Sequence, residues 1–251
     1  MGKFTGKTAI ISGGSRDIGR AVCIKLASEG ANVVINYHSN AEQAAETLKA
    51  IEKTGGKAII AQADVTKPEE VDALVAEAVN AFGDQIHMLV NVAGGMVERR
   101  PLEAMDYDFF EYVMRLNMTS TFLLTKAVVP HMPKGSAIVN FASQAGRDGG
   151  GPGASAYGTS KGAVMTFTRA MAKELGPKGI RVNSLCPGMI ATTFHDIFTK
   201  DEVRQNVANA TPLRRQGIVH EPADAAAYLL SDEASFITGA NVDINGGMYF
   251  S

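Results

Sequence analysis

The sequence predicts an α/β fold, a doubly wound parallel sheet of about seven strands with helices on both faces. Short apolar runs of strand type alternate along the chain with longer stretches in which apolar residues recur at helical spacing. The strand-like runs are apolar on both faces, as strands buried inside a parallel sheet are. They span residues 8–12, 32–37, 58–62, 86–92, 137–142, 181–185 and 240–244.

The segments between these runs predict helices and loops. Residues 41–53 and 68–82 space Ala, Leu, Ile and Val by three and four positions, as amphipathic helices do. Residues 144–154 hold five glycines and one proline, so we expect a loop there. Residues 192–217 are more polar and irregular. They predict a partly helical excursion before a last helix over residues 222–231.

Length and composition fit one domain over residues 1–251. The net charge of -2 gives no strong field to attract nucleic acid or an anionic membrane. The first residues lack the pattern of a signal peptide, and no run of 18 apolar residues predicts a membrane span. We therefore expect a cytoplasmic protein with no nucleic-acid or membrane partner.

The two cysteines, Cys23 and Cys186, cannot build a disulfide scaffold. Neither lies in a cluster with the spacing of metal ligands. We expect both to be buried, unreactive thiols, and we expect no metal site.

A glycine-rich turn follows the first strand and opens a helix. It reads Ser-Gly-Gly-Ser-Arg-Asp-Ile-Gly over residues 12–19. Glycines let the backbone approach a pyrophosphate, and the helix N-terminus offers free N–H groups. This context predicts a bound dinucleotide, with an ordinary strand-to-helix connection as the alternative. The turn residues assigned to the cofactor are Gly13, Ser15, Arg16, Ile18 and Gly19.

The end of the second strand bears on which dinucleotide binds. A free ribose 2′-OH usually meets an acidic residue there, but residues 36–40 read Asn-Tyr-His-Ser-Asn. Arg16 suits a 2′-phosphate instead, so we expect NADP(H) rather than NAD(H). Two alternatives stay open: Arg16 as a solvated turn residue, and Asn36 as a hydrogen-bond partner of an unphosphorylated ribose.

Tyr157 and Lys161 open a strongly helical segment and lie four residues apart, so they share one face of the helix. The ordinary pKa of tyrosine, about 10, is too high for proton exchange at neutral pH, and a nearby ammonium favours the phenolate. Lys161 supplies that charge. Ser143 lies just past the fifth strand. Its hydroxyl is placed to donate a hydrogen bond, together with Tyr157, to the oxygen of a carbonyl that accepts hydride.

These motifs occur in an order that resembles the short-chain dehydrogenase/reductase family, closest to its 3-oxoacyl-[acyl-carrier-protein] reductase branch. The resemblance covers nearly the whole chain and rests on the turn from Gly13 to Gly19, Asp64, Val65, Asn91, Gly94, Asn117, Ser143, Tyr157, Lys161, Pro187 and Gly188. It implies a Rossmann-type domain that transfers a hydride between NADP(H) and a carbonyl or secondary alcohol. The implied catalytic residues are Ser143, Tyr157, Lys161 and Asn117.

The resemblance also implies how the cofactor is held. The adenine would be flanked by Asp64 and Val65, the crevice supported by Asn91 and Gly94, and the carboxamide of the nicotinamide held by Ile190 and Thr192 after Pro187 and Gly188. Lys161 would also grip the nicotinamide ribose, and Asn117 would anchor a water that links Lys161 to solvent. For Asn117 a helix cap or kink is the alternative.

Asp17 departs from the family pattern, which usually has glycine at this position. A carboxylate beside a pyrophosphate repels it, by about 1 kcal/mol in water at 4 Å and by more in a drier site. We expect the side chain of Asp17 to point outwards, at the positive end of the helix dipole. We therefore expect Asp17→Gly to change the cofactor KM by several-fold at most.

The resemblance implies that residues 144–156 line the substrate pocket, and we expect residues 192–217 to contribute to it as well. Residues 96–100 and 193–195 are expected in the pocket or at its rim. Arg147 is a candidate contact for an anionic substrate, with a solvated side chain as the alternative. His195 either reaches the substrate or lies on the surface of a mobile lid.

The resemblance leaves the substrate open between a 3-oxoacyl thioester and a small keto or sugar acid. Carrier-protein reductases hold their acidic partner with arginines where this chain has Lys134 and Lys178. Acyl carrier protein is therefore one expected partner and a small-molecule carbonyl the other. The family's usual assembly implies a homotetramer. A non-catalytic dinucleotide-binding sensor is the alternative function, since fold does not imply function.

Overall fold

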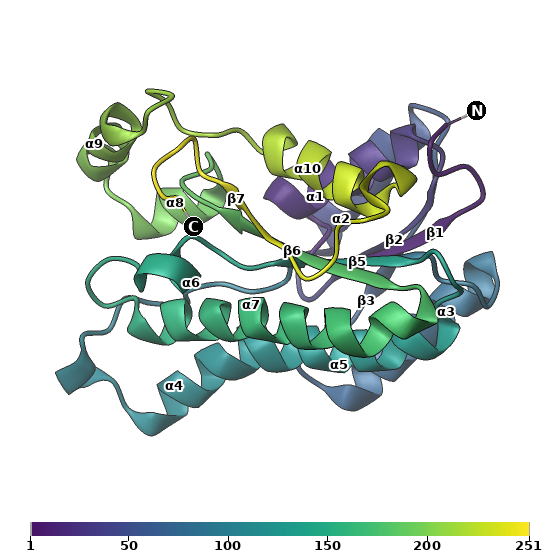
Figure 1. Ribbon diagram of the computed structural model, residues 1–251, viewed down its shortest axis with the longest axis horizontal. Helices are drawn as coiled ribbons and strands as arrows, with labels where there is room; N and C mark the ends of the chain where they lie inside the picture. The colour runs from purple at the N-terminus through teal and green to yellow at the C-terminus, as the bar shows by residue number, and fades with distance from the viewer. Residues whose placement is uncertain (1, 251) are drawn as a thin grey trace.

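The computed structural model describes residues 2–250; Met1 and Ser251, the ends of the expected domain, lie outside the described residues. Seven strands form one sheet in the order β3-β2-β1-β4-β5-β6-β7, and every neighbouring pair is parallel (Figure 1). The strands are β1 (Thr8–Ser12), β2 (Asn32–Tyr37), β3 (Lys57–Gln62), β4 (Met88–Asn91), β5 (Ala137–Phe141), β6 (Arg181–Pro187) and β7 (Asn241–Ile244). The fold class predicted from the sequence is confirmed.

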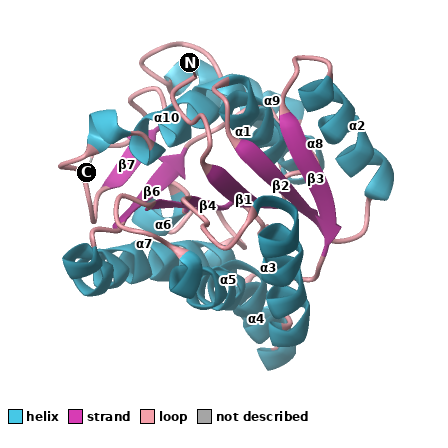
Figure 2. Cartoon of the chain, turned by 90° about the vertical axis from the view of Figure 1, so that its right-hand side faces the viewer, coloured by secondary structure: helices cyan, strands magenta, loops and turns pink. Residues whose placement is uncertain are grey.

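Helices cover both faces of the sheet (Figure 2). One face carries α1 (Asp17–Ser28), α2 (Ala41–Glu52) and α10 (His220–Leu230), and the other carries α3 (Pro68–Phe82), α5 (Ser120–Val128) and α7 (Ser155–Leu175), with α4 (Tyr107–Met114) packed on α7. In α3 the buried residues Val71, Leu74, Val75 and Ala78 recur at three and four positions, which turns one stripe of the helix to the sheet. Pro68 begins α3, where its missing N–H is not needed.

Several element boundaries differ from the sequence prediction by one or two residues, and two of these differences have identifiable reasons. β4 ends at Asn91, because the N–H of Val92 donates to the hydroxyl of Ser12 at 3.1 Å instead of continuing the ladder. α10 begins two residues earlier than predicted. There the Glu221 carboxylate accepts the N–H of Ile218 at 2.8 Å and holds the first turn.

The strand order reverses between β1 and β4, which is where a ligand crevice forms in such sheets. The Ser12 hydroxyl at the end of β1 accepts the N–H groups of Val92 at 3.1 Å and Ala93 at 3.2 Å. This side chain therefore fixes the spacing between the two loops that diverge from the crevice.

Residues 192–217, here called the lid, hold two helices, α8 (Thr193–Phe198) and α9 (Asp201–Ala210). Figure 1 shows both beyond one end of the sheet, away from its layers. Two hydrogen bonds close the base of the lid: Gly217 N–H donates to the Met189 carbonyl at 2.9 Å, and Ala191 N–H donates to the Gly217 carbonyl at 2.8 Å.

The loop expected over residues 144–154 contains one short helix, α6 (Ala145–Asp148). Its start is fixed by Ser143, whose hydroxyl accepts the N–H of Ala145 at 3.1 Å. It ends at Gly149, which adopts the left-handed conformation with φ 81°. The loop prediction was therefore wrong for these four residues, because the turn after Ser143 is extended by one helical turn.

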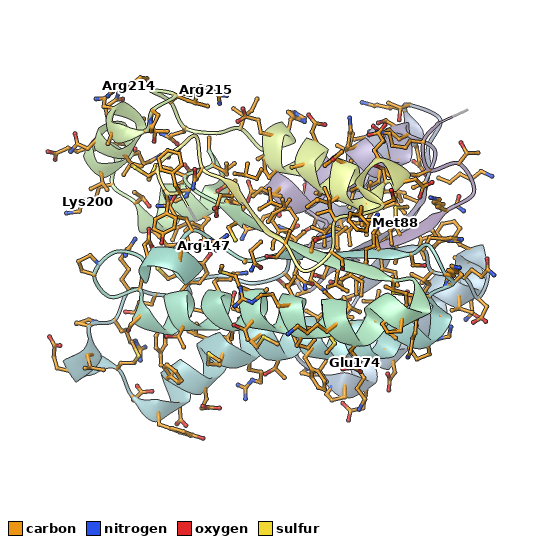
Figure 3. The ribbon with its side chains drawn as sticks, in the orientation of Figure 1. Met88, Arg147, Glu174, Lys200, Arg214 and Arg215 are labelled. Atoms are coloured by element: carbon orange, nitrogen blue, oxygen red, sulfur yellow. The ribbon has the colours of Figure 1, made fainter. Side chains whose placement is uncertain are left out.

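Arg147 lies neither in solvent nor toward the substrate, so both readings of the sequence were wrong. Its guanidinium donates to the Asp243 carboxylate at 3.1 Å and to the Asn241 carbonyl at 2.6 Å, and both charged side chains are about 85% buried. Figure 3 shows Arg147 between α6 and β7. The pair therefore fastens the loop after β5 to the edge strand of the sheet.

Arg147→Met is expected to lower the free energy of unfolding by about 3 kcal/mol, because Asp243 would be left as a buried, unpaired charge. Urea denaturation measures this change. The control is Arg169→Met, which removes an exposed arginine and should change the unfolding free energy by less than about 0.5 kcal/mol. Equal effects of the two substitutions would contradict a structural role for Arg147.

Cys23 and Cys186 are both buried and free, as the sequence predicted. Burial raises the pKa of each thiol, so both remain protonated at neutral pH. Over residues 2–250, no helix has the length and apolarity needed to cross a membrane.

Candidate active site

A cavity of about 1100 Å³ lies at the carboxyl edge of the sheet. The loops after β1, β4, β5 and β6, the first turns of α7 and the lid all contribute to its wall. Thirteen of the residues selected from the sequence line it: Gly13, Ser15, Arg16, Ile18, Gly19, Gly94, Ser143, Tyr157, Lys161, Pro187, Gly188, Ile190 and Thr192. Segments far apart in the sequence thus meet in one crevice.

The floor of this crevice fits a dinucleotide. Gly13 has φ 66°, and a Cβ atom on Gly19 would stand 2.0 Å from the Gly13 carbonyl oxygen. A Cβ atom on Gly94 would stand 2.4 Å from Asn117 Oδ1. Side chains are excluded at Gly19 and Gly94 because they would collide with neighbouring loops of the protein itself. These glycines therefore allow the tight turn at the start of α1, and such a turn at a helix N-terminus suits a pyrophosphate. Among residues 2–250, no group of three or more His, Cys, Asp or Glu is arranged to hold a metal ion.

Asn36 does not reach the crevice, contrary to the sequence-based assignment. Its Nδ2 donates to the carbonyls of Ala61 at 3.3 Å and Ala63 at 3.1 Å, while its Oδ1 accepts the N–H of Gly13 at 3.3 Å. The residue is 2% exposed. Its amide is therefore used to join β2, the end of β3 and the glycine turn, and is not available to a ribose hydroxyl.

Three further cofactor candidates lie behind the wall of the crevice. Asp64 Oδ1 accepts the N–H of Thr66 at 3.0 Å and its hydroxyl at 2.7 Å. Val65 is buried in the apolar core between the sheet and α3. Asn91 donates to Asn140 Oδ1 at 2.8 Å inside the sheet. These side chains hold the loops that form the crevice and do not line it themselves.

Tyr157, Lys161 and Ser143 converge at one end of the crevice. Lys161 Nζ donates to the carbonyl of Phe141, the last residue of β5, at 2.6 Å, and lies 5.9 Å from the centre of the Tyr157 ring. The Ser143 hydroxyl lies near enough to the Tyr157 phenol to lower the pKa of the phenol. The helical spacing that the sequence indicated thus places Tyr157 and Lys161 on the face of α7 that lines the crevice.

Burial sets the proton affinities of this group. It lowers the pKa of Lys161 to about 8. It raises the pKa of Tyr157, against a smaller opposite effect of the Ser143 hydrogen bond. The Tyr157 pKa is thus raised and Lys161 is not among the groups that lower it, so the lowering expected from the sequence is not observed in this structure.

Asn117 is fully buried and lies in a π-helical turn, η2 (Arg115–Thr119), between α4 and α5. Its side chain accepts the N–H of Gly95 and donates to the Gly95 carbonyl, both at 2.9 Å, and donates also to the Val113 carbonyl. The side chain thus clamps the loop after β4. The irregular helix agrees with the alternative reading of Asn117 as the site of a kink, and Asn117 does not itself line the crevice.

The lid closes over the tyrosine. The ring of Phe194 in α8 lies 5.8 Å from the ring of Tyr157. His195 lines the crevice beside it and shares a hydrogen bond of 2.9 Å with the Thr199 hydroxyl. Burial, together with the positive charges of Arg204 and Arg99, lowers the pKa of His195 to about 4, so its imidazole is neutral at neutral pH.

Arg99 joins the loops around the crevice, a contact that the sequence analysis did not predict beyond a position in the pocket or at its rim. Its guanidinium donates to the Pro152 carbonyl at 3.0 Å and to the Phe198 carbonyl at 3.3 Å. Both acceptors are neutral. Within the described chain no carboxylate lies within 4.0 Å of it, so its charge is uncompensated at this distance.

Asp17 does not point outwards, so that prediction was wrong. Its carboxylate accepts the N–H of Thr193 at 3.2 Å and the Thr193 hydroxyl at 2.5 Å. Arg16 Nη1 donates to the same hydroxyl at 2.6 Å. The glycine turn therefore contacts Thr193 of the lid, the first residue of α8.

Comparisons with known proteins agree with this geometry. A family model described as enoyl-(acyl carrier protein) reductase matches residues 13–249. Glucose 1-dehydrogenase 2 of Bacillus subtilis is 40% identical over 98% of this chain and 95% of its own length. The 3-oxoacyl-[acyl-carrier-protein] reductase FabG of Staphylococcus aureus is 35% identical over 97% and 98%. A solved short-chain dehydrogenase/reductase from Serratia marcescens superimposes with a TM-score of 0.93 at 32% identity, over 98% of this chain and 99% of that one. The chain therefore belongs to the short-chain dehydrogenase/reductase family.

Proposed function

We propose that the protein transfers a hydride between NADP(H) and the carbonyl or secondary alcohol carbon of a small substrate. The observation that carries this proposal is the convergence of Tyr157, Ser143 and Lys161 in the crevice that also contains the glycine turn. The test is oxidation of NADPH and NADH with a panel of carbonyl compounds. Turnover of at least one carbonyl is the expected result.

The chain's own residues handle the oxygen of the substrate. Tyr157 protonates this oxygen during reduction and removes the proton during oxidation. The Ser143 hydroxyl donates a hydrogen bond to the same oxygen and stabilises its developing negative charge. Lys161 keeps a positive charge beside the phenol, and Asn117 fixes the loop that forms the facing wall. When bound, the nicotinamide supplies or accepts the hydride.

The preference for NADP(H) rests on the residues at the end of β2. The crevice is lined there by Tyr37, His38, Ser39, Asn40 and Gln43, and no carboxylate is among them. Arg16, with about half of its side chain exposed, adds a positive charge on the neighbouring turn, and its Nε lies 3.8 Å from the Asp17 carboxylate. A 2′-phosphate would thus meet donors at the end of β2 and no acid among the residues there.

The kcat/KM for NADPH is expected to exceed that for NADH by roughly 10- to 100-fold, the range given by one or two hydrogen bonds to a charged group. Steady-state kinetics with a carbonyl from the panel measures this ratio. Ser39→Asp should reverse it, because it places a carboxylate at the end of β2. A higher kcat/KM for NADH in the unaltered protein would refute the preference.

For the substrate we propose a small oxo acid or sugar-derived acid. Arg99 is the charge that favours it, since its guanidinium lines the crevice and meets only neutral carbonyl groups. The neutral imidazole of His195 lies beside it and can form a hydrogen bond with the substrate without adding a charge. The aromatic side chains of Phe194 and Phe198 restrict the space to a compact substrate.

Arg99→Gln is expected to raise the KM for an oxo acid by roughly 10- to 100-fold, because a hydrogen bond to a charged group is lost. The KM for an uncharged ketone of similar size should change little. Arg100→Gln is the matched control, since Arg100 pairs with Glu98 and Asp106 and does not line the crevice. Equal effects of Arg99→Gln on charged and uncharged substrates would argue against a carboxylate contact.

A 3-oxoacyl thioester is the second candidate. It is supported by the similarity to the Staphylococcus aureus 3-oxoacyl-[acyl-carrier-protein] reductase and to the matching family model. Lys134 and Lys178 would then meet the acidic carrier protein in place of arginines. Oxidation of NADPH with an acetoacetyl thioester, compared with 2-keto and keto-deoxy sugar acids, separates the two candidates.

We also propose a homotetramer, as the family's usual assembly suggests. Tyr112 on α4 and Phe122 on α5 are exposed by 43% and 42%, which gives these helices an apolar outer surface. Gel filtration with light scattering tests this assembly, and a monomer would refute it.

A further inference from the structure

Asp17 adopts a backbone conformation that glycine favours. Its φ is 48°, in the left-handed region, although it is the first residue of α1. Side chains are disfavoured there, and such a conformation persists where surrounding contacts hold it. The chain therefore retains a strained aspartate in the turn where glycine fits without strain.

The contacts that hold Asp17 come from the lid. Its carboxylate accepts both the N–H and the hydroxyl of Thr193, at 3.2 and 2.5 Å, and Arg16 donates to the same hydroxyl at 2.6 Å. The Asp17 side chain is 25% exposed. Two adjacent residues of the cofactor turn thus hold the first residue of α8, 176 positions further along the chain.

Thr193 directly precedes the residues that cover the catalytic tyrosine. Phe194 lies 5.8 Å from the Tyr157 ring, and His195 packs against Phe194 with ring centres 5.1 Å apart. At the other end of α8, the Phe198 carbonyl accepts a hydrogen bond from Arg99. α8 is therefore held at both ends, by the cofactor turn at its start and by the loop after β4 at its end.

We propose that Asp17 is a positioning residue of the substrate site, which acts from the cofactor turn through Thr193 to hold Phe194 over Tyr157. The inference rests on the proposed function. It has a second consequence, because the same carboxylate lies in the turn assigned to the pyrophosphate and repels it, although the Arg16 guanidinium 3.8 Å away offsets part of this repulsion. Asp17 would thus strengthen substrate binding while weakening dinucleotide binding.

Asp17→Gly tests both effects in a variant that relieves backbone strain and so should fold. We expect the substrate KM to rise about tenfold, as for the loss of one hydrogen bond to a charged group. We expect the dissociation constant of NADPH, measured by fluorescence titration without substrate, to fall several-fold. Hydrogen exchange of the amides of residues 193–198 should become faster.

Two further variants separate the contact from the charge. Thr193→Val removes the hydroxyl and keeps the carboxylate, so it should raise the substrate KM without tightening NADPH binding. The double variant should show no additional rise in substrate KM, since both changes break one contact. Asp84→Gly, at an exposed position on another loop, is the control and should leave exchange in α8 unchanged.

Unchanged hydrogen exchange in α8 of Asp17→Gly would overturn the inference, and so would an unchanged substrate KM. An additive double variant would also overturn it. The exchange and titration experiments need no turnover. If the wild-type protein reduces no carbonyl, the proposed function is refuted. The hydrogen-exchange result would still show whether Asp17 holds α8.

Discussion

Tyr157→Phe is expected to lower kcat by about 10²- to 10⁴-fold, the contribution of a positioned acid in proton transfer. The phenol lines the crevice together with Ser143, and the ring that carries it packs against Phe194 of the lid. Phenylalanine keeps the ring and its packing but has no proton to give. The NADPH dissociation constant should therefore change little while turnover is lost.

Steady-state kinetics and fluorescence titration of the same preparation measure these two quantities. Tyr228→Phe is the control, since this tyrosine is exposed on α10 and does not line the crevice. A Tyr157→Phe protein with kcat within tenfold of the original would show that another group supplies the proton. Loss of turnover with retained binding would exclude a sensor as the function.

Lys161→Met is expected to lower kcat by about 10²-fold or more, because it removes the buried positive charge beside Tyr157. The KM for NADPH should rise as well, if the ammonium holds the nicotinamide ribose. Methionine keeps an apolar stem of similar length, so the packing of α7 is conserved. Lys173→Met, at an exposed position on the same helix, is the control.

The pKa of Lys161 also predicts the direction in which the rate of carbonyl reduction changes with pH. Burial lowers this pKa from 10.5 to about 8, so the ammonium is present below pH 8 and is lost as the pH rises through this value. The rate of carbonyl reduction should therefore fall above about pH 8. A rate that is flat up to pH 10 would contradict a role for the charged form.

The sequence predicted most of the fold because local patterns determine it. The residues of α3 show a helical period, and the runs that form β1 and β5 are apolar on both faces. The candidate catalytic group was predictable for the same reason, since Tyr157 and Lys161 are one helical turn apart. Ser143 follows directly from the end of β5, at the edge where loops gather.

The errors concern side chains whose partners lie far away in the sequence. Arg147 pairs with Asp243, 96 residues later, and Asp17 binds Thr193, 176 residues later. The side-chain amide of Asn36 donates hydrogen bonds to carbonyl groups at the end of β3. No local pattern encodes these contacts, because they depend on which loops the sheet brings together. The same reason explains why Arg99 was assigned to the pocket or its rim and not to a particular contact.

Transfer of deuterium tests the central claim most directly. NADPH deuterated at both C4 positions of the nicotinamide is incubated with the best carbonyl substrate of the panel, and the product is examined by mass spectrometry and NMR. Direct hydride transfer predicts one deuterium per product molecule, on the carbon that carried the oxygen. A product without deuterium on that carbon would contradict the account.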